Sequence, residues 1–367
     1  MKIELIDLKQ RYREESYQIL TCIKKVVSKG HLVLTQELNN FEKNICNYTG
    51  SKYCLGLNSG TDALMIALWS LGIGKGDEVI TSPTSFVATI GAIIHVGAKP
   101  VLVDIAGDLN IDPSKIEAKI TKKTKAIMPV HWAGRMCDMD QICKIAKKYK
   151  LKIIEDAAQG MGSFFNNKHA GTFSDIAAFS THPLKNLNGL GDGGFITTNS
   201  KYLYEKIKLY RNHGMKSRDN VHIFGVNSRL DVLNAEVLNF RLKKLNSIIL
   251  KRRKNALAYK KFLDPKYVQV PFDSKNHFSS FVIFLCLCEK RDELQKYLRK
   301  KGIQSLIYYG TPLHKHFASK RINLDKIELP VAEKLAKKVL ALPHHQGLKL
   351  KHIKFICKQI NNFYKKF

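Results

Sequence analysis

Apolar and polar residues alternate along the chain in a pattern that predicts strands and helices in turn. Short apolar runs, typical of buried strands, are separated by longer stretches with helical periodicity. The predicted strands are residues 54–57, 76–82, 100–105, 126–131 and 152–158, and the predicted helices between them are 63–71, 85–97 and 139–150. Strands separated by helices in this way predict a mostly parallel central sheet with helices on both faces, an α/β fold.

The second half of the chain follows a different order of elements. Predicted strands at 176–179 and 195–198 are followed by a helix at 201–211 and a long helical pattern at 231–260. An apolar segment at 277–288 predicts a further strand, and a helix follows it at 291–302. We therefore expect an N-terminal arm and large domain over residues 1–245 and a smaller α/β domain over residues 246–367. The boundary falls inside the long helical pattern, because no flexible linker is visible.

The segment 175–199 carries the most distinctive candidate chemistry. Its sequence, DIAAFSTHPLKNLNGLGDGGFITTN, predicts a strand, a loop that holds Lys185, and a second strand. A lysine chosen at random is a solvated surface charge. Lys185 differs because it lies between two buried strands, where desolvation lowers the pKa of an amine and makes it a Schiff-base nucleophile.

Polar residues also follow two other predicted strands, at the sheet edge where open parallel sheets bind ligands. Gly60 and Thr61 open a helix after the strand at 54–57. Backbone N–H groups and a hydroxyl in that position suit a phosphate, although Ser59 or Thr61 would equally serve as an ordinary helix cap. Asp156 ends the strand KIIEDAA, where a carboxylate needs a cationic partner. Asp156 would then form a structural salt bridge or cap a helix, or it would pair with the protonated nitrogen of a heteroaromatic ring.

Further candidates depend on the same edge of the sheet. Ser180, five residues before Lys185, is placed to donate a hydroxyl to the phosphate predicted at Thr61. Phe86 lies at the start of a helix, as a core residue or as a ring stacked on a planar cofactor. The glycines at 189–194 precede a strand rather than a helix, so they are not a dinucleotide fingerprint. We interpret them as allowing the loop to pass close to a bound cofactor.

Several classes of protein are excluded by what the chain lacks. The longest apolar run, 281–288, is too short to span a bilayer, and the N-terminus has no signal-peptide core. Eight cysteines form no C-x-x-C pair, which favours the reducing cytoplasm. Neither a metal-binding histidine pattern nor the G-x-S-x-G elbow of a serine hydrolase is present. The lysine hypothesis therefore has no strong competitor.

The net charge of +30 leaves three interpretations open. Nine lysines and no acidic residue occur from Lys334 to the C-terminus, which is compatible with nucleic-acid binding. However, the basic residues are spread along the chain and form no known nucleic-acid module. An anionic small substrate, or simply a solvated basic surface, fits this distribution better. We therefore expect neither a nucleic-acid nor a membrane partner.

Taken together, these motifs resemble the DegT/DnrJ/EryC1/StrS family of sugar aminotransferases, which are fold-type I pyridoxal phosphate enzymes. The resemblance covers nearly the whole chain. It is carried in order by IDLKQRY, ELNNFEKNICNYTGSKYCLGLNSGTDAL, TSFVAT, EDAAQG, HPLKNLNGLGDGG, GVNSRLDVLNAE and YYGTPLHKH. Each motif is weak alone, but their order and spacing are specific.

The resemblance implies a role for each candidate residue. Lys185 would form the internal aldimine with pyridoxal 5′-phosphate and then move the proton between donor and acceptor carbons. Asp156 would pair with the pyridinium nitrogen, Gln159 would lie against the cofactor, and Phe86 would stack on its ring. Gly60, Thr61 and Ser180 would hold the phosphate. Asn227, in GVNSR, would reach that phosphate from the neighbouring subunit of a homodimer.

The implied reaction moves an amino group from L-glutamate, through pyridoxamine phosphate, to a keto group of a nucleotide-activated sugar. The lysine favours transamination over the dehydration that family members with histidine there perform, and the KNLNGLGDGG form resembles members that aminate C3. Thr35, Met136 and Thr181 depart from the family's usual residues. A smaller phosphorylated ketone remains an alternative acceptor, and a non-catalytic regulatory protein on the same fold remains an alternative function.

Overall fold

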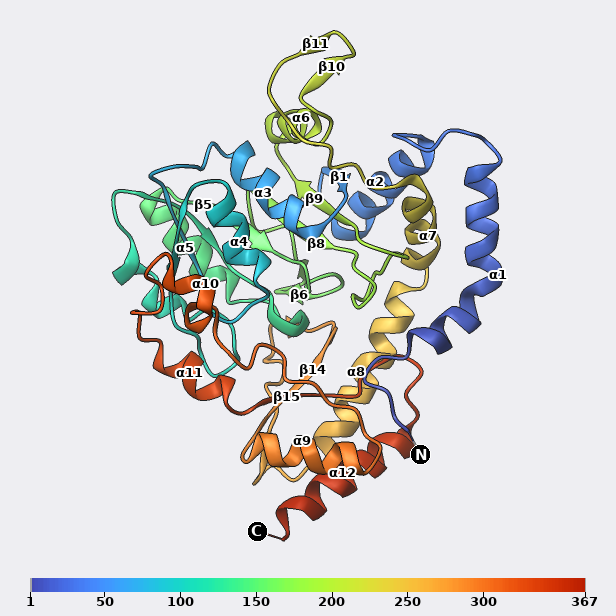
Figure 1. The fold of residues 1–367 in the computed structure, drawn as a ribbon, viewed down its shortest axis with the longest axis vertical. Coiled ribbons are helices and arrows are strands. Elements are labelled where there is room, and N and C mark those ends of the chain that lie inside the picture. Colours follow the sequence, from blue (N-terminus) through green and yellow to red (C-terminus); the bar gives the residue numbers. More distant parts are fainter. Residues whose placement is uncertain (1, 367) are drawn as a thin grey trace.

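A seven-stranded sheet forms the centre of the molecule, whose computed structural model describes residues 2–366 (Figure 1). Across the sheet the strands are β1 (Tyr53–Leu57), β9 (Gly194–Thr198), β8 (Ile176–Ser180), β5 (Lys152–Asp156), β4 (Thr124–Met128), β2 (Glu78–Thr81) and β3 (Lys99–Leu102). β9 is antiparallel to both of its neighbours, and every other neighbouring pair is parallel. The predicted mostly parallel sheet is confirmed.

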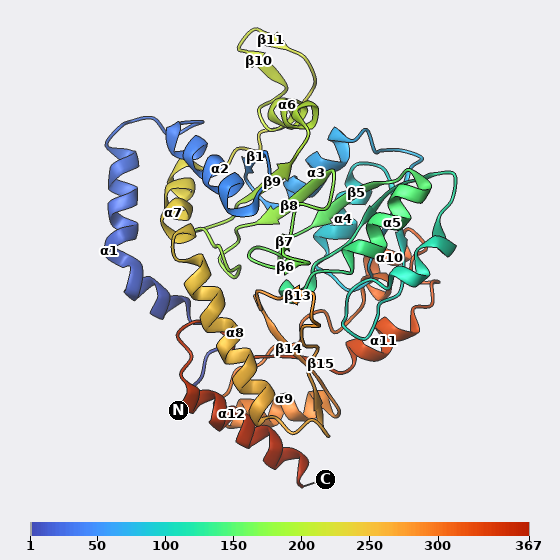
Figure 2. The same ribbon diagram turned by 180° about the vertical axis from the view of Figure 1, so that it is seen from behind.

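Helices cover both faces of this sheet, as the alternating pattern predicted (Figures 1 and 2). One face carries α3 (Gly60–Ser70), α4 (Ala88–His95) and α6 (Lys201–Tyr210), and the other carries α2 (Gln36–Thr49), α5 (Met139–Tyr149) and α7 (Val232–Leu242). Successive strand residues enter opposite cores because side chains alternate along a strand. Ile153 lies in the core under α2, α5 and α7, whereas Ile154 lies in the core under α3, α4 and α6.

The C-terminal part has its own antiparallel sheet and core. Its strands are β12 (Val268–Gln269), β14 (Phe284–Cys288) and β15 (Val339–Leu342), packed with α8 (Leu245–Phe262), α9 (Arg291–Lys300) and α12 (Leu350–Tyr364). Apart from Ile3, the buried residues of this core all come from positions after 255. The change from one core to the other falls inside α8, since Leu245 and Ile249 still pack in the core of the central sheet. The division at residue 245 stays a prediction.

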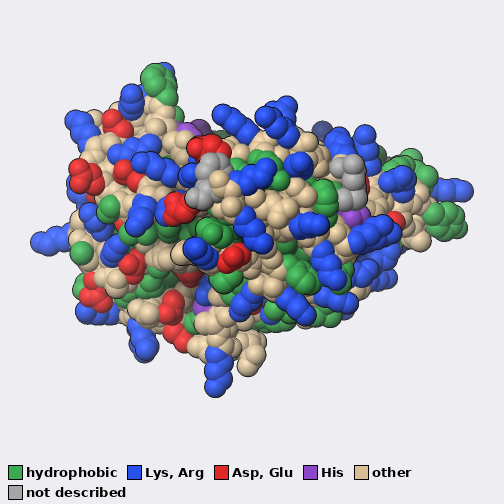
Figure 3. All heavy atoms as spheres, turned by 90° about the horizontal axis from the view of Figure 1, so that it is seen from below, with side chains coloured by type: hydrophobic (Ala, Val, Ile, Leu, Met, Phe, Trp, Pro, Cys, Tyr) green, Lys and Arg blue, Asp and Glu red, His purple; other side chains and the backbone are tan. Residues whose placement is uncertain are grey.

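The remaining elements connect these two parts or project from them. They are α1 (Leu8–Val27), β6 (Phe164–Phe165), β7 (Lys168–His169), β13 (His277–Phe278), α10 (Phe317–Lys320), α11 (Pro330–Ala336) and the hairpin β10 (Met215–Ser217) with β11 (Asn220–Val221). The hairpin projects from the end of the molecule opposite the C-terminus (Figure 1). Viewed from the C-terminal end, lysine and arginine side chains outnumber acidic ones on the exposed face (Figure 3).

Two predicted elements are divided in the structure. The helical pattern at 231–260 forms two helices, α7 and α8. α7 packs against α1 and α2, whereas α8 packs against α12 and enters both cores, with Leu245 and Ile249 in the core of the central sheet and Ala256 and Tyr259 in that of the C-terminal sheet. The apolar segment 277–288 forms β13, paired with β6, and β14, paired with β15. Phe281 lies between them with a left-handed φ of 47°, which redirects the chain before β14 begins.

Candidate active site

A cavity of about 320 Å³ opens where β5 and β8 end and α3 begins. Parallel strands place their carboxyl ends at one edge, and pairing of Asp156 with Ala178 aligns the ends of β5 and β8. Seven of the eight predicted site residues line this cavity: Gly60, Thr61, Phe86, Asp156, Gln159, Ser180 and Lys185. The eighth, Asn227, lines an adjacent cavity of about 640 Å³, and Asp192 belongs to both linings.

Lys185 reaches the cavity from the loop that joins β8 to β9. The loop is closed at its base, where Thr181 donates its N–H to the Gly193 carbonyl at 2.8 Å and accepts the N–H of Gly189 at 2.6 Å. Desolvation lowers the pKa of the Lys185 amine to about 8, although the negative charge of Asp156 opposes this shift. A substantial fraction of the amine is therefore neutral near pH 7 to 8, as a nucleophile or base must be.

Asp156 is buried at the end of β5 and accepts two hydrogen bonds. Its carboxylate receives the hydroxyl of Thr89 at 2.7 Å and the N–H of Ala158 at 3.2 Å. Burial raises its pKa, and these hydrogen bonds together with the charge of Lys185 only partly offset that effect. The carboxylate therefore lacks a directly bonded cation, which is the partner that a buried charge needs.

The first turn of α3 presents unpaired donors to the cavity. Ser59 caps the helix by accepting the N–H of Asp62 at 3.0 Å, so the N–H groups of Gly60 and Thr61 have no intrahelical acceptor. The Ser180 backbone lies so close that a Cβ on Gly60 would approach the Ser180 Cβ to 2.9 Å. Glycine at this position therefore brings the helix N-terminus against the end of β8.

Aromatic side chains form one wall of the cavity. The ring of Phe86 is 56% exposed and lies 6.3 Å from the ring of Tyr309, which lies 4.5 Å from Trp132. Phe86 precedes α4 rather than starting it. Gln159 lines the same cavity. Its side-chain oxygen accepts the N–H of Ala133 at 2.7 Å.

Tyr308 and Tyr309 line the cavity but were not among the predicted site residues. They come from the C-terminal part of the chain, in the YYGTPLHKH segment. Tyr309 has a left-handed φ of 55°, which is uncommon for a bulky residue. The paired tyrosines in that motif were the available signal, although no strand or helix periodicity surrounds them.

The glycine-rich loop behaves differently from our interpretation. A Cβ on Gly189 would fall 2.4 Å from the Asn234 side chain, and one on Gly194 would fall 2.5 Å from the Ser59 backbone. Gly189 and Gly194 therefore let the loop approach α7 and the residue before α3. Only Gly193, whose Cβ would approach the Thr181 hydroxyl to 2.3 Å, also lines the cavity.

The three departures from the family pattern lie outside the cavity lining. Thr181 and Met136 are buried, and Thr35 is the residue preceding α2, where its hydroxyl contacts Glu37 at 2.5 Å. The Thr181 hydroxyl has no hydrogen-bond partner within residues 2–366. In this chain Thr181 contributes to the base of the lysine loop.

The cavity residues fit pyridoxal phosphate. The free N–H groups of α3 and the hydroxyls of Thr61 and Ser180 would hold the phosphate, and Asp156 would receive the protonated ring nitrogen. Lys185, with its lowered pKa, would bond to the aldehyde carbon. Across residues 2–366 no group of three or more His, Cys, Asp or Glu side chains is arranged to hold a metal ion, and no helix is long and apolar enough to cross a membrane.

Comparison with known proteins gives consistent matches over the full chain. The profile of the DegT/DnrJ/EryC1/StrS aminotransferase family matches residues 14–361. A dTDP-3-amino-3,6-dideoxy-alpha-D-galactopyranose transaminase of Aneurinibacillus thermoaerophilus is 38% identical, with 98% of this chain and 99% of the relative covered. A pleiotropic regulatory protein of Geobacillus stearothermophilus is also 38% identical, with both chains fully covered.

A solved structure shows the same fold. The S. venezuelae DesV crystal structure, in complex with a ketimine intermediate, superposes with a TM-score of 0.96 at 34% identity, covering 99% of this chain and 98% of that one.

Proposed function

The chain belongs to the DegT/DnrJ/EryC1/StrS aminotransferase family, and we propose that it moves the amino group of L-glutamate to a nucleotide-activated keto sugar. The observation that carries this proposal is the convergence of Lys185, Asp156 and the first turn of α3 on one cavity. An amine, a buried carboxylate and a phosphate-sized set of donors are what pyridoxal phosphate requires of its protein.

Each residue has a distinct task in the proposed reaction. When bound, pyridoxal phosphate supplies an electron sink that stabilises a carbanion. Asp156 would keep the ring nitrogen of the bound cofactor protonated, which requires the carboxylate to remain ionised. Lys185 would hold the cofactor through its amine, and the same amine would carry a proton to or from the substrate carbon. Phe86 and Tyr309 form part of the cavity wall and would limit the access of water to the bound cofactor.

The acceptor is assigned from the relatives. The Aneurinibacillus relative is named for a dTDP-linked 3-amino sugar, which agrees with the KNLNGLGDGG motif in favouring amination at C3. A nucleotide-linked ketone carries a pyrophosphate, and a chain of net charge +30 attracts such an anion. We propose that the product enters cell-surface polysaccharide or glycan biosynthesis in the cytoplasm.

We further propose that the active unit is a homodimer. Asn227 lies outside the main cavity of its own chain and lines the adjacent one with Arg229 and Asp192. A second subunit placed over that adjacent cavity would bring its own Asn227 toward the phosphate. This arrangement would make each site depend on both chains.

An absorption spectrum provides the direct test. Purified protein supplied with pyridoxal phosphate should develop a visible band that bleaches when L-glutamate is added. Addition of dTDP- or UDP-linked 3-keto sugars should then restore the band, whereas a phosphorylated small ketone should not. A protein that takes up no cofactor would contradict the proposal.

Lys185→Ala separates the chemistry from the fold. The variant should lose the band and all turnover, because no other lysine lines the cavity. Its melting temperature should not fall, since the buried amine is replaced by a neutral side chain. Lys168→Ala, which changes an exposed lysine of β7, is the matched control and should behave as the wild type.

The regulatory name of the Geobacillus relative raises a second candidate, a non-catalytic role on the same fold. The two functions predict different outcomes of the spectral test. A regulator would bind the cofactor without bleaching on addition of glutamate.

A further inference from the structure

Two consecutive carboxylates end β5, and only the second of them lines the cavity. Side chains alternate along a strand, so Asp156 faces the cavity while Glu155 points to the opposite face of the sheet. Glu155 is fully buried, as is His131, and the Nε2 of His131 lies 2.8 Å from Oε2 of Glu155. No role has been assigned to either residue in the proposed reaction.

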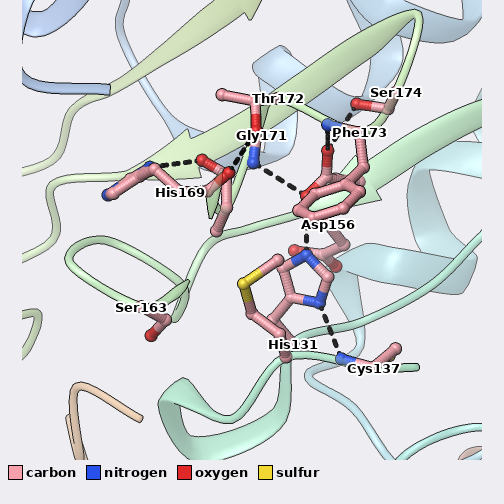
Figure 4. A network of polar contacts seen from close by, with 12 residues as sticks. His131, Cys137, Asp156, Ser163, His169, Gly171, Thr172, Phe173 and Ser174 are labelled. Carbon is pink, nitrogen blue, oxygen red and sulfur yellow. Dashed lines mark hydrogen bonds and ion pairs between the residues drawn. The ribbon is translucent and has the colours of Figure 1, made fainter. Parts of the chain in front are cut away.

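Glu155 receives four hydrogen bonds from two segments of the chain, His131 and Gly171–Ser174. Besides the His131 ring, Oε2 accepts the N–H of Gly171 at 2.7 Å. Oε1 accepts the N–H of Phe173 at 3.1 Å and the hydroxyl of Ser174 at 2.8 Å. Figure 4 shows these donors gathered beside Asp156. Burial raises the pKa of Glu155, but the hydrogen bonds outweigh it and the pKa lies below its usual value.

The tautomer of His131 is set by its other neighbour. Its Nδ1 accepts the N–H of Cys137 at 3.3 Å (Figure 4). The ring proton therefore resides on Nε2 and is donated to Glu155. The pair is thus an ionised carboxylate and a neutral imidazole. Each nitrogen and oxygen atom of the two side chains forms at least one hydrogen bond.

The same network holds the residues that meet the cofactor. The backbone N–H of His131 donates to the carbonyl of Asp156 at 3.1 Å, which fixes the strand end that carries the cavity carboxylate. Two residues beyond His131, the N–H of Ala133 donates to Gln159 at 2.7 Å. The Gly171–Ser174 segment leads directly into β8, whose last residue is Ser180.

From this geometry we propose that Glu155 and His131 form a positioning pair that fixes the Asp156 carboxylate and the Gln159 amide where a bound ring must meet them. The proposal rests on the proposed function, because it concerns how that cofactor is held. Apolar side chains would fill the same space without the cost of burying a charge. What the pair adds is therefore a set of hydrogen bonds that fixes the direction of the groups around it.

Glu155→Gln tests the pair sharply, because the amide brings a donor where the carboxylate only accepts. Its NH₂ would face the N–H of Gly171 or Phe173, or the His131 ring. If His131 changed tautomer to compensate, its Nδ1–H would face the N–H of Cys137. The substitution must therefore move His131, Cys137 or part of the Gly171–Ser174 segment.

Three measurements on Glu155→Gln are expected to change. Pyridoxal phosphate should be retained about 10- to 100-fold less tightly, the loss typical when a group that orients a ligand-binding side chain is removed. The visible band and the pH at which it titrates should both shift. In the crystal structure of the cofactor-free variant, the 2.7 Å contact between Ala133 and Gln159 should break.

Glu42→Gln is the matched control. Glu42 is also a buried glutamate that accepts a backbone N–H, from Gly56 at 2.9 Å, and bonds to a basic side chain, Arg211, but it does not line the cavity. This variant should lose stability while keeping the wild-type band and titration. His131→Gln, which keeps a donor near the Nε2 position, should restore much of what His131→Leu loses.

The outcomes separate the two proposals. If the wild-type protein binds no pyridoxal phosphate, the proposed function fails, and the pair is then judged from the crystal structures alone. An unchanged Ala133–Gln159 contact in Glu155→Gln, or the same spectral shift in Glu42→Gln, would overturn the positioning role. If Glu155→Gln does not fold, Ser174→Ala removes one of the four donors and should shift the band in the same direction by less.

Discussion

Where strands of the central sheet end at the cavity, their side chains are polar. The C-terminal sheet, in contrast, is surrounded by apolar side chains. At the end of β5, Glu155 and Asp156 are both buried, and the second has no directly bonded cation. In β14, Phe284, Cys286 and Cys288 are fully buried in the C-terminal core. One region accepts a cost in stability to hold reactive groups, and the other supplies stability.

The two regions nevertheless meet in one site. Val282 and Ile283, just before β14, line the cavity together with Tyr308 and Tyr309. The C-terminal core therefore holds one wall of the cavity while contributing none of its ionised groups. This difference predicts that substitutions in the central sheet change chemistry, and that substitutions in the C-terminal sheet change stability.

Asp156→Asn should have the largest effect on chemistry. Without a negative charge at the ring nitrogen, turnover should fall by more than about a hundredfold. The pKa of Asp156 is raised by burial, so the folded protein binds this proton more tightly than the unfolded chain, and that stabilisation is lost as pH rises through the folded pKa. At pH 7 the carboxylate is therefore a cost, and the cofactor-free variant should melt no lower than the wild type. A variant that lost stability as well as activity would contradict the expectation that substitutions in the central sheet change chemistry rather than stability.

Phe284→Ala should have the largest effect on stability. The Phe284 ring is fully buried and stacks on Tyr259 with centroids 4.5 Å apart. Its removal should cost about 3–5 kcal/mol in the free energy of unfolding, measured by urea denaturation. At a temperature where the variant is folded, the cofactor band should keep its position. A shifted band would show that the C-terminal core acts on the chemistry as well.

Gly60→Ala should have a smaller effect, confined to cofactor retention. The added Cβ would approach Ser180 to 2.9 Å and push the first turn of α3 from the end of β8. Retention should weaken by about tenfold, the lower end of the range for a displaced binding group. Gly91→Ala in α4 is the matched control, since its Cβ would meet nothing within 4 Å. This control should stabilise the protein by about 0.5–1 kcal/mol and leave retention unchanged.

The periodicity of the sequence predicted the central sheet, because apolar residues form short continuous runs in buried strands and recur every three to four residues in the helices that cover them. It did not predict the division of 231–260 into α7 and α8. Helical periodicity shows only that a face is apolar, and both helices have such a face. The elements that each helix packs against come from far away in the sequence, α1 and α2 for α7 and α12 for α8.

The site was predictable where it depends on strand ends. Gly60, Asp156 and Ser180 each lie at the end of a parallel strand or just beyond it, so topology alone brings them together. Tyr308 and Tyr309 were missed because they belong to an irregular segment whose position depends on packing of the C-terminal part. The role of Asn227 stays a prediction, since it depends on a second chain.

The pairing of β1 with β9 has a consequence for synthesis on the ribosome. β1 (Tyr53–Leu57) leads directly into α3, yet its only partner in the sheet is β9 (Gly194–Thr198). At a translation rate of about 5–20 residues per second, β1 waits on the order of 10 seconds for that partner to be made. During that time the backbone N–H and C=O groups along its edges stay unpaired, and the nascent chain is open to chaperones and to aggregation. The cavity is completed later still, because Val282, Ile283, Tyr308 and Tyr309 in its lining are made after β9.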